Sequence, residues 1–218
     1  MSGSRRILKH VVVMGVSATG KTTVAEELAD ELGCEFIEGD DLHPASNIAK
    51  MSDGIPLTDE DRWPWLQAIA ELVAVKDHEG TSTVVTCSAL KRSYRAVLSD
   101  AAPTFFVHLD APFEVLAERM KLRTKHFMPT TLLKSQFDAL EQLGDDESGA
   151  VIDVTPPIDE VIEESINAEA TSDRDISTAD ARVRTVVVQA SEATEIARET
   201  RRVVGNAPPR AHEPNTRS

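Results

Sequence analysis

Short apolar segments alternate with longer segments of helical spacing through most of the chain. This alternation is typical of repeated strand–helix–strand units, which build a parallel sheet covered by helices on both faces. The strands of such a sheet are buried on both sides, so they appear as apolar runs rather than as alternating polar and apolar positions. The predicted strands cover residues 9–14, 35–37, 83–87, 104–109 and 150–154. We therefore expect an α/β fold with three layers and a five-stranded parallel sheet.

Segments in which apolar residues recur three and four positions apart are predicted to form the flanking helices. They cover residues 21–32, 58–76, 113–122, 131–140 and 158–167. Thr58 begins one of them and Asp61 follows three residues later, which is the arrangement of an N-terminal capping pair. Pro112 stands directly before another helix, where the missing N–H of proline is tolerated.

The composition changes at about residue 169, after which polar and charged residues dominate and three prolines lie close to the C-terminus. An apolar run at 183–188 and a segment of helical composition at 191–204 leave room for an element that docks on a partner chain. The composition as a whole favours disorder or a loosely attached helix. We expect a domain over residues 1–168 and a C-terminal extension over 169–218 that is mobile or partly helical.

The formal net charge is −14, from 37 acidic and 23 basic residues. This charge disfavours nucleic acid or an anionic membrane as the main partner, because both repel an acidic surface. The apolar run at residues 11–16 is too short for a transmembrane helix, and no cleavage site of small residues follows it. Cys34 and Cys87 lack the spacing of metal ligands, so we expect reduced thiols in a cytoplasmic protein.

Residues 15–22 read Gly-Val-Ser-Ala-Thr-Gly-Lys-Thr, which fits the pattern G-x-x-x-x-G-K-[ST] between a strand and a helix. The glycines of such a P-loop let the backbone pass close to phosphates, so that its N–H groups and a helix N-terminus face the anion. Lys21 is expected to reach the β- and γ-phosphates of ATP, and the Thr22 hydroxyl is expected to bind Mg²⁺. The expected nucleotide-binding residues are Gly15, Val16, Ser17, Ala18, Thr19, Gly20, Lys21, Thr22 and Thr23.

Two aspartates and a histidine follow the second predicted strand, at the sheet edge where ligands of open parallel sheets bind. Asp40 is expected to accept the proton of an attacking hydroxyl or to hold Mg²⁺, although a turn or helix-capping role is the alternative. Asp41 is the better candidate for such a cap. His43 is either a substrate ligand or a polar turn residue before Pro44.

Several basic residues are expected to face the same cleft. Arg62, Lys91 and Arg92 stand at positions where strand or helix ends should face this cleft, and together they favour a phosphorylated or carboxylated substrate. Any one of them taken singly is more often a solvated or paired surface residue. Trp63 and Trp65 could stack on a substrate, but packing residues near the surface are the commoner case.

Arg119 and Arg123 are four residues apart, a spacing that puts both guanidinium groups on one helix face. They stand just before residues 124–129. A mobile lid that delivers arginines to the transferring phosphoryl group has this arrangement. We therefore expect Arg119 and Arg123 to act in catalysis together with Lys21 and Asp40.

The assembled blocks resemble those of the gluconokinase family, in the same order. The resemblance rests on residues 15–22; on 39–44 with Asn47, Lys50 and Met51; on 54–59 with Asp61, Arg62, Trp65 and Leu66; on 87–91 with Tyr94 and Arg95; on 126–129; and on 135–137 with Leu140 and Glu141. It spans about residues 11–166 and excludes the extension. Ala18 stands where gluconokinases commonly carry glycine.

The resemblance implies ATP-dependent phosphorylation of D-gluconate at its 6-hydroxyl, which gives 6-phospho-D-gluconate and ADP, by a cytosolic homodimer with the P-loop fold of shikimate kinase. By the same resemblance, Asp40 binds or deprotonates the acceptor hydroxyl, and Arg62 and Lys91 contact the hydroxyls and carboxylate of the sugar acid. Arg119, Arg123 and His126 resemble the lid residues. The expected substrate-binding residues are Asp40, His43, Arg62, Lys91 and His126.

Three alternatives are a shikimate-like or nucleoside-monophosphate kinase, a nucleotide-binding scaffold without catalysis, and a switch protein of the GTPase type. The last is disfavoured, because the D-x-x-G match at residues 77–80 precedes its strand and no N-K-x-D segment exists.

Overall fold

The computed structural model describes residues 10–122 and 130–172. The chain divides into two units, residues 1–173 and 174–218, and the described residues belong to the first. Its elements, in chain order, are β1 (His10–Met14), α1 (Lys21–Leu32), β2 (Glu35–Ile37), the short 3₁₀ helix η1 (Gly39–Leu42), α2 (Ala45–Ser52), α3 (Asp59–Glu79), β3 (Thr83–Thr86), α4 (Arg92–Ala101), β4 (Thr104–Asp110), α5 (Phe113–Leu122), α6 (Thr130–Ala139), β5 (Gly149–Asp153) and α7 (Ile158–Ser172).

The five strands form one parallel sheet in the order β2-β3-β1-β4-β5. The central strand β1 pairs with β3 on one side and β4 on the other, so that Val11 lies level with Val84 and Phe105. The predicted five-stranded parallel sheet is therefore confirmed, and the strand ends differ from prediction by at most one residue. Parallel strands send all their carboxyl ends to one edge, which is where the site residues gather.

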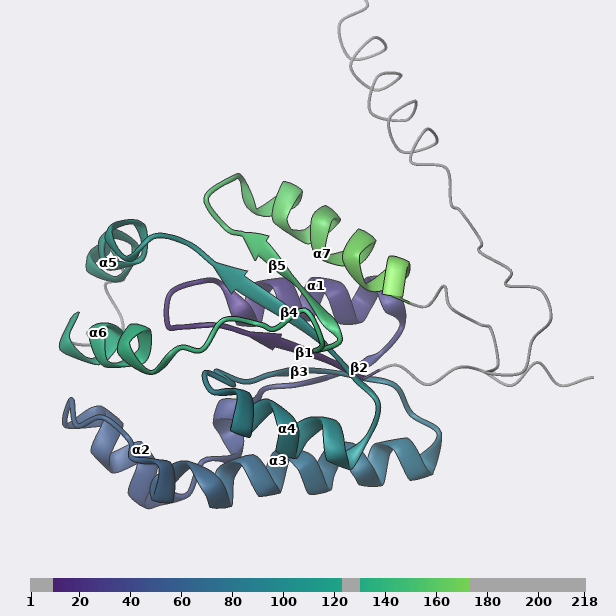
Figure 1. Ribbon diagram of the computed structural model, residues 1–218, viewed down its shortest axis with the longest axis horizontal. Coiled ribbons are helices and arrows are strands. Elements are labelled where there is room, and N and C mark those ends of the chain that lie inside the picture. Colours follow the sequence, from purple (N-terminus) through teal and green to yellow (C-terminus); the bar gives the residue numbers. More distant parts are fainter. Residues whose placement is uncertain (1–9, 123–129, 173–218) are drawn as a thin grey trace, which may run out of the picture. The chain divides into compact units, whose positions relative to one another are not determined.

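Helices cover both faces of the sheet and make the three predicted layers (Figure 1). α1 and α7 lie on one face, and α3 and α4 lie on the other. Neighbouring residues of β1 point to opposite layers: Val11 and Val13 pack in the core beneath α1 and α7, whereas Val12 and Met14 pack against α3 and α4. All five residues of β1 are buried, which explains why the strand appears as a continuous apolar run.

Thr58 and Asp61 form the predicted capping box at the start of α3, and Gly80 ends that helix in a left-handed conformation. α2 and α4 were not predicted. The buried residues of α4 are Tyr94, Arg95 and Leu98. Because an arginine normally indicates a solvent-exposed position, the apolar face of this helix is not recognisable in the sequence. α7 runs four residues past the predicted domain boundary at residue 168.

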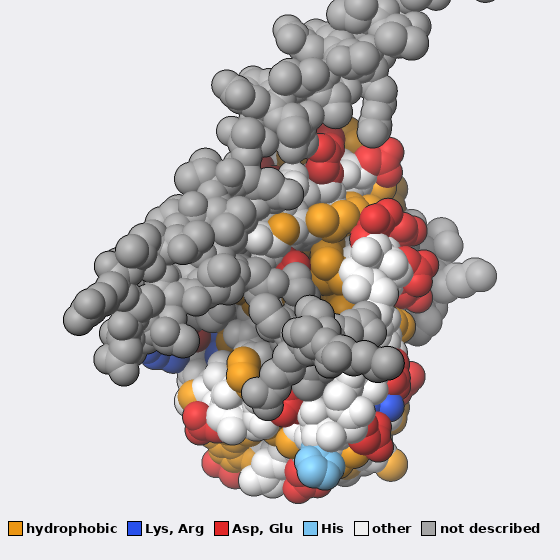
Figure 2. Space-filling view, turned by 90° about the vertical axis from the view of Figure 1, so that its right-hand side faces the viewer, with side chains coloured by type: hydrophobic (Ala, Val, Ile, Leu, Met, Phe, Trp, Pro, Cys, Tyr) orange, Lys and Arg blue, Asp and Glu red, His pale blue; other side chains and the backbone are white. Residues whose placement is uncertain are grey.

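The side of the molecule opposite to α2, α5 and α6 faces the viewer in Figure 2. Acidic side chains form broad patches on the described part of this face, and basic side chains are few there, in line with the net charge of −14. Of the helices in residues 10–122 and 130–172, none combines the length and apolar character that a membrane span requires.

Candidate functional site

The P-loop lies between the carboxyl end of β1 and the start of α1, and its shape depends on unusual backbone angles. Gly15, Ala18 and Gly20 have φ values of +133°, +69° and +93°. A Cβ at Gly15 would overlap the carbonyl oxygen of Leu109, so the loop can pass this close to β4 only with glycine at that position. Thr19 closes the loop by donating to the carbonyl of Val16 at 3.0 Å. The turn therefore presents backbone N–H groups and the N-terminus of α1 to the sheet edge.

Lys21 and Ser17 line a cleft above this edge. The Lys21 Nζ donates to the carbonyl oxygen of Val16 at 2.9 Å, and the Ser17 N–H donates to Oε1 of Gln136 at 2.7 Å. Gln136 comes from α6, which is 119 residues further along the chain. One side chain of α6 thus contacts the phosphate-binding loop directly.

Glu38, which sequence reasoning missed, connects the P-loop to the strand ends. Its carboxylate accepts hydrogen bonds from the Thr22 hydroxyl at 2.8 Å, from the Thr86 hydroxyl, and from the N–H of Asp40 at 3.4 Å. The available signal was a carboxylate directly after a strand and two residues before Asp40. Glu38 therefore lies beside the predicted magnesium ligand Thr22.

Asp40 lies on η1, and its backbone is fixed by the preceding glycine. The Gly39 N–H donates to the Thr86 hydroxyl at 3.0 Å, and the Gly39 carbonyl accepts from the Trp65 indole at 2.7 Å. A Cβ at Gly39 would overlap the carbonyl oxygen of Thr86. Desolvation by the cleft walls raises the pKa of Asp40 while Lys21 opposes this, although 73% of the Asp40 side chain is open to water.

His43 is buried and stacks on Trp65, with ring centroids 4.1 Å apart. The Asn47 amide lies 3.3 Å from Nδ1 of His43; since that amide nitrogen is a donor, Nδ1 accepts and Nε2 carries the proton. Nε2 lies 3.9 Å from Asp40. Burial and then the charge of Arg62 lower the pKa of His43 to about 4, so His43 is neutral at pH 7. Trp65 is a packing residue, as expected for this pair of tryptophans.

Arg62 projects from α3 toward the cleft, and only 9% of it is exposed. Its Nε donates to the carbonyl of Leu57 at 3.4 Å, and its guanidinium lies 5.9 Å from the ring centre of Tyr94. Within residues 10–122 and 130–172 no carboxylate forms an ion pair with Arg62. Its charge is therefore available to an anion in the cleft.

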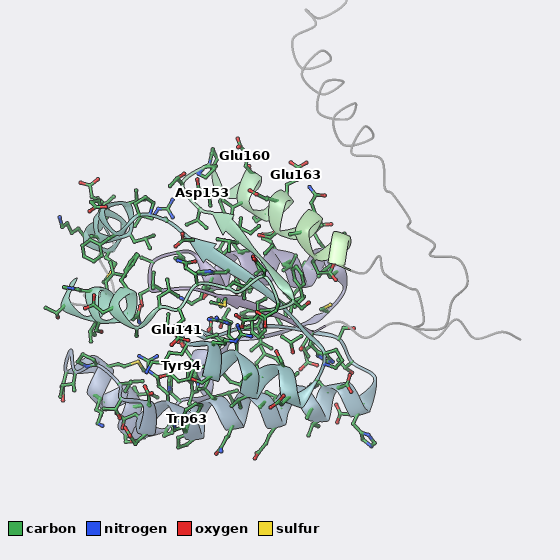
Figure 3. All side chains as sticks on the ribbon, in the orientation of Figure 1. Trp63, Tyr94, Glu141, Asp153, Glu160 and Glu163 are labelled. Carbon is green, nitrogen blue, oxygen red and sulfur yellow. The ribbon has the colours of Figure 1, made fainter. Side chains whose placement is uncertain are left out.

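Lys91 has a different environment. Its Nζ is held by both carboxylate oxygens of Asp59, at 2.7 and 2.8 Å, and Asp59 also accepts from the Tyr94 hydroxyl at 2.6 Å. Figure 3 shows Tyr94 on α4 and Trp63 on α3 beneath it, and their rings meet edge to face at 5.2 Å. Lys91 is not among the described residues that line the cleft, but its Nζ lies 5.6 Å from the centre of the Tyr94 ring that Arg62 also contacts.

Of the predicted lid residues, Arg119 is described. It donates to the carbonyl oxygen of Val154 at 2.5 Å, directly after β5 and therefore at the same sheet edge. Arg123, His126 and the segment 124–129 lie outside the described residues.

The cleft is partly open to solvent. Residues from the P-loop, the β2–α3 region, the segment after β3 and α6 form its walls. They are Ser17, Lys21, Asp40, His43, Met51, Ile55, Pro56, Leu57, Arg62, Ser88, Leu132, Ser135 and Gln136. In the described part of the chain no group of three or more His, Cys, Asp or Glu residues could hold a metal ion by itself.

The AAA domain family matches residues 11–143 of this chain. A gluconokinase from Gluconobacter oxydans (strain 621H) is 50% identical over 159 residues, which cover 72% of this chain and 89% of that protein. A crystal structure of a gluconokinase from Sinorhizobium meliloti 1021 has a TM-score of 0.70 at 49% identity and covers 76% of this chain and 93% of its own. An unliganded sugar kinase from Janibacter sp. HTCC2649 has a TM-score of 0.71 at 53% identity, with coverages of 74% and 94%.

Proposed function

The chain belongs to the gluconokinase family, and from that premise we propose that the cleft transfers the γ-phosphoryl group of ATP to the 6-hydroxyl of D-gluconate. The observation that carries the proposal is the composition of the cleft wall. A phosphate-binding lysine, a carboxylate and an available guanidinium, Lys21, Asp40 and Arg62, line one cavity. These are the three groups that a kinase acting on a sugar acid requires.

Lys21 and the P-loop backbone bind the phosphates and neutralise the charge that develops during transfer. Because the transition state of phosphoryl transfer is loose in most analyses, positioning and electrostatics supply most of the catalysis. Asp40 binds the acceptor hydroxyl and takes its proton while the new oxygen–phosphorus bond forms and the bond to the β-phosphate oxygen breaks. The fixed backbone of Gly39 supports this role, because it holds the Asp40 carboxylate at the sheet edge.

Arg62 binds the carboxylate at the other end of the acceptor. A guanidinium presents a planar pair of donors that matches a carboxylate, and Arg62 has no competing ion pair among the described residues. His43, with its Nε2–H toward the cleft, donates to a substrate hydroxyl. Lys91 contributes to this side through Asp59 and Tyr94, both of which lie beside Arg62. Arg119, Arg123 and His126 stay predicted lid residues.

The Thr22 hydroxyl and the nearby carboxylates Asp40 and Glu38 fit a magnesium ion that is completed by nucleotide phosphates. Mg²⁺ in proteins is commonly held by one or two carboxylates together with substrate phosphates. The hydrogen bond between Thr22 and Glu38 places a carboxylate beside the hydroxyl that other P-loops give to the metal. When bound, the ion would supply positive charge that neutralises the charge of the phosphates.

Assembly as a homodimer and location in the cytoplasm are further parts of the proposal, and both rest on the family resemblance. Cys34 and Cys87 are free, which suits a reducing compartment. Light scattering of the purified chain measures the assembly directly, and a monomer mass would exclude the dimer.

The test is ADP release by the purified protein with Mg²⁺ and ATP. D-gluconate is compared with shikimate, glycerate, nucleoside monophosphates and no acceptor. Turnover that depends on gluconate and exceeds the blank is the expected result. Turnover on another acceptor alone would show that this acceptor, and not gluconate, is the substrate. ATP binding without turnover on any acceptor would show that the chain is a nucleotide-binding scaffold.

A further inference from the structure

Gln136 is the one side chain of α6 that bonds to the P-loop within the described part of the chain. Its Oε1 accepts the N–H of Ser17 at 2.7 Å, and it lines the cleft together with Lys21 and Asp40. The contact joins segments that are 119 residues apart. The backbone N–H of Ser17 in the phosphate-binding loop therefore donates to a neutral amide oxygen.

This contact fixes the orientation of the Gln136 carboxamide. Only its oxygen can accept the Ser17 N–H, so the NH₂ group lies on the other side of the same carbon atom. Among the residues that the structure describes, none accepts a hydrogen bond from this NH₂ group. The two N–H bonds of this amide therefore lie at the wall of the cleft, where a ligand can accept from them.

The end of α6 is anchored, so Gln136 is held in place. Phe137 meets Phe113 of α5 edge to face at 5.4 Å. Glu141, just beyond the helix, donates its N–H to the carbonyl of Leu90 at 2.8 Å and accepts from the buried Arg95 at 2.9 Å. Figure 3 shows Glu141 between α6 and α4. A residue whose helix is anchored directly after it loses little conformational entropy when it binds a ligand.

We propose that Gln136 is a catalytic residue: the Ser17 N–H holds its amide oxygen, and its NH₂ group donates to an oxygen of the transferring phosphoryl group. The inference rests on the proposed kinase function and adds a donor to it. Gln136 forms no covalent bond and moves no proton. It stabilises negative charge at the phosphoryl oxygens, in the way that preorganised donors stabilise oxyanions.

Two variants distinguish a catalytic role of Gln136 from a purely structural role and from competition with ATP. Gln136→Met keeps the length and apolar part of the side chain and removes both polar groups. Gln136→Glu keeps an oxygen for the Ser17 N–H, removes the donors and adds a negative charge. The control is Asp138→Asn on the same helix; Asp138 is 62% exposed and pairs only with Lys134 among the described residues. The measurements are kcat, the gluconate KM, the Kd of ATP and the melting temperature.

We expect kcat to fall roughly 10- to 100-fold in Gln136→Met, since a single oxyanion donor is typically worth that or more. The loss in Gln136→Glu is at least as large, because its charge repels the phosphoryl group. The Kd of ATP and the gluconate KM stay within about twofold in the Met variant, because the donor acts in the transition state. Asp138→Asn matches the wild type in all four quantities.

Unchanged kcat with tighter ATP binding in Gln136→Met would overturn the proposal. It would mean that Gln136 only competes with ATP for the N–H groups of the P-loop. A parallel loss of ATP affinity, kcat and melting temperature in both variants would overturn it in favour of a structural role. A wild type that works on another acceptor refutes the gluconate assignment alone, and the variants are then compared on that acceptor. A wild type without any turnover refutes both proposals.

Discussion

The nucleotide half and the acceptor half of the cleft are built by different means. In the P-loop, the shape comes from positive φ values and from bonds between residues three to five positions apart, such as those of Thr19 and Lys21 to the Val16 carbonyl. On the acceptor side, the fixing bonds span 26 to 47 residues, from Trp65 to Gly39 and from Gly39 to Thr86. The turn of the P-loop is therefore encoded mainly by its own residues, with Gln136 as a distant contact, whereas the acceptor side depends on the folded tertiary structure.

The two halves also divide the chemistry. The P-loop binds phosphates through backbone N–H groups and a single lysine, which suits any nucleotide triphosphate. The acceptor half carries His43, Arg62 and Asp40, which line the cleft and which we propose decide which acceptor fits. Substitutions in the nucleotide half should therefore change the Kd of ATP, whereas substitutions in the acceptor half should leave it unchanged.

The largest expected effect is in the nucleotide half. Lys21→Ala removes a positive charge from the β- and γ-phosphates, so we expect kcat to fall by about 10³-fold or more, equivalent to about 4 kcal/mol.

Asp40→Asn in the acceptor half should lower kcat by about 10²-fold, since the acceptor loses its base. Steady-state kinetics and the Kd of ATP are measured for both.

The comparison predicts that the Kd of ATP rises in Lys21→Ala and stays at the wild-type value in Asp40→Asn. Near-wild-type kcat in Lys21→Ala would refute the P-loop assignment. Unchanged kcat in Asp40→Asn would reduce Asp40 to a turn residue.

The difference between the halves explains what the sequence could predict. The turn between β1 and α1 was predicted from the spacing of its glycines, lysine and threonine, because that spacing encodes the turn. The parallel sheet was predicted as well, because strands buried on both faces are apolar runs. Glu38 and Gln136 were missed, since their roles come from the Thr22 and Ser17 contacts, which no local pattern contains.

Lys91 illustrates the same limit from the other side. Its place after β3 predicted a cleft residue, yet Asp59 from another helix holds its ammonium group. The sequence gives no means of knowing which of several basic residues acquires a carboxylate partner. The charge that stays available, that of Arg62, is known only from the folded arrangement.

The next effect concerns the buried His43 in the acceptor half. Its pKa is lowered to about 4 by burial and by Arg62, whereas an unfolded histidine titrates near 6.5. Between these values the unfolded state binds more protons, so stability falls as the pH falls. Going from pH 7 to pH 5 should cost about 2 kcal/mol through this residue. Urea unfolding at both pH values measures the change.

His43→Phe keeps an aromatic ring on Trp65 and cannot titrate, so it should lose that part of the pH dependence. Asn47 retains its bond to the Asp61 carbonyl at 2.7 Å in this variant. His108, whose pKa is also lowered by burial, and Asp40, whose pKa is raised, are common to both proteins and cancel in the difference. An equal slope in the two proteins would show that His43 is already solvated in the folded state.

The smallest effect is expected at Ala18, the P-loop position with alanine in a left-handed conformation, at φ +69°. Ala18→Gly relieves about 1–2 kcal/mol of backbone strain. It also frees the unfolded chain, at a cost of about 0.4–1 kcal/mol, and removes a buried methyl group worth about 0.8 kcal/mol. These terms nearly cancel, so we expect the free energy of unfolding to change by less than about 0.5 kcal/mol, with kcat and the Kd of ATP unchanged. Urea unfolding and kinetics of the variant check this. A gain above about 1 kcal/mol would mean that strain dominates, and a change in kcat alone would mean that the alanine tunes the phosphate-binding backbone.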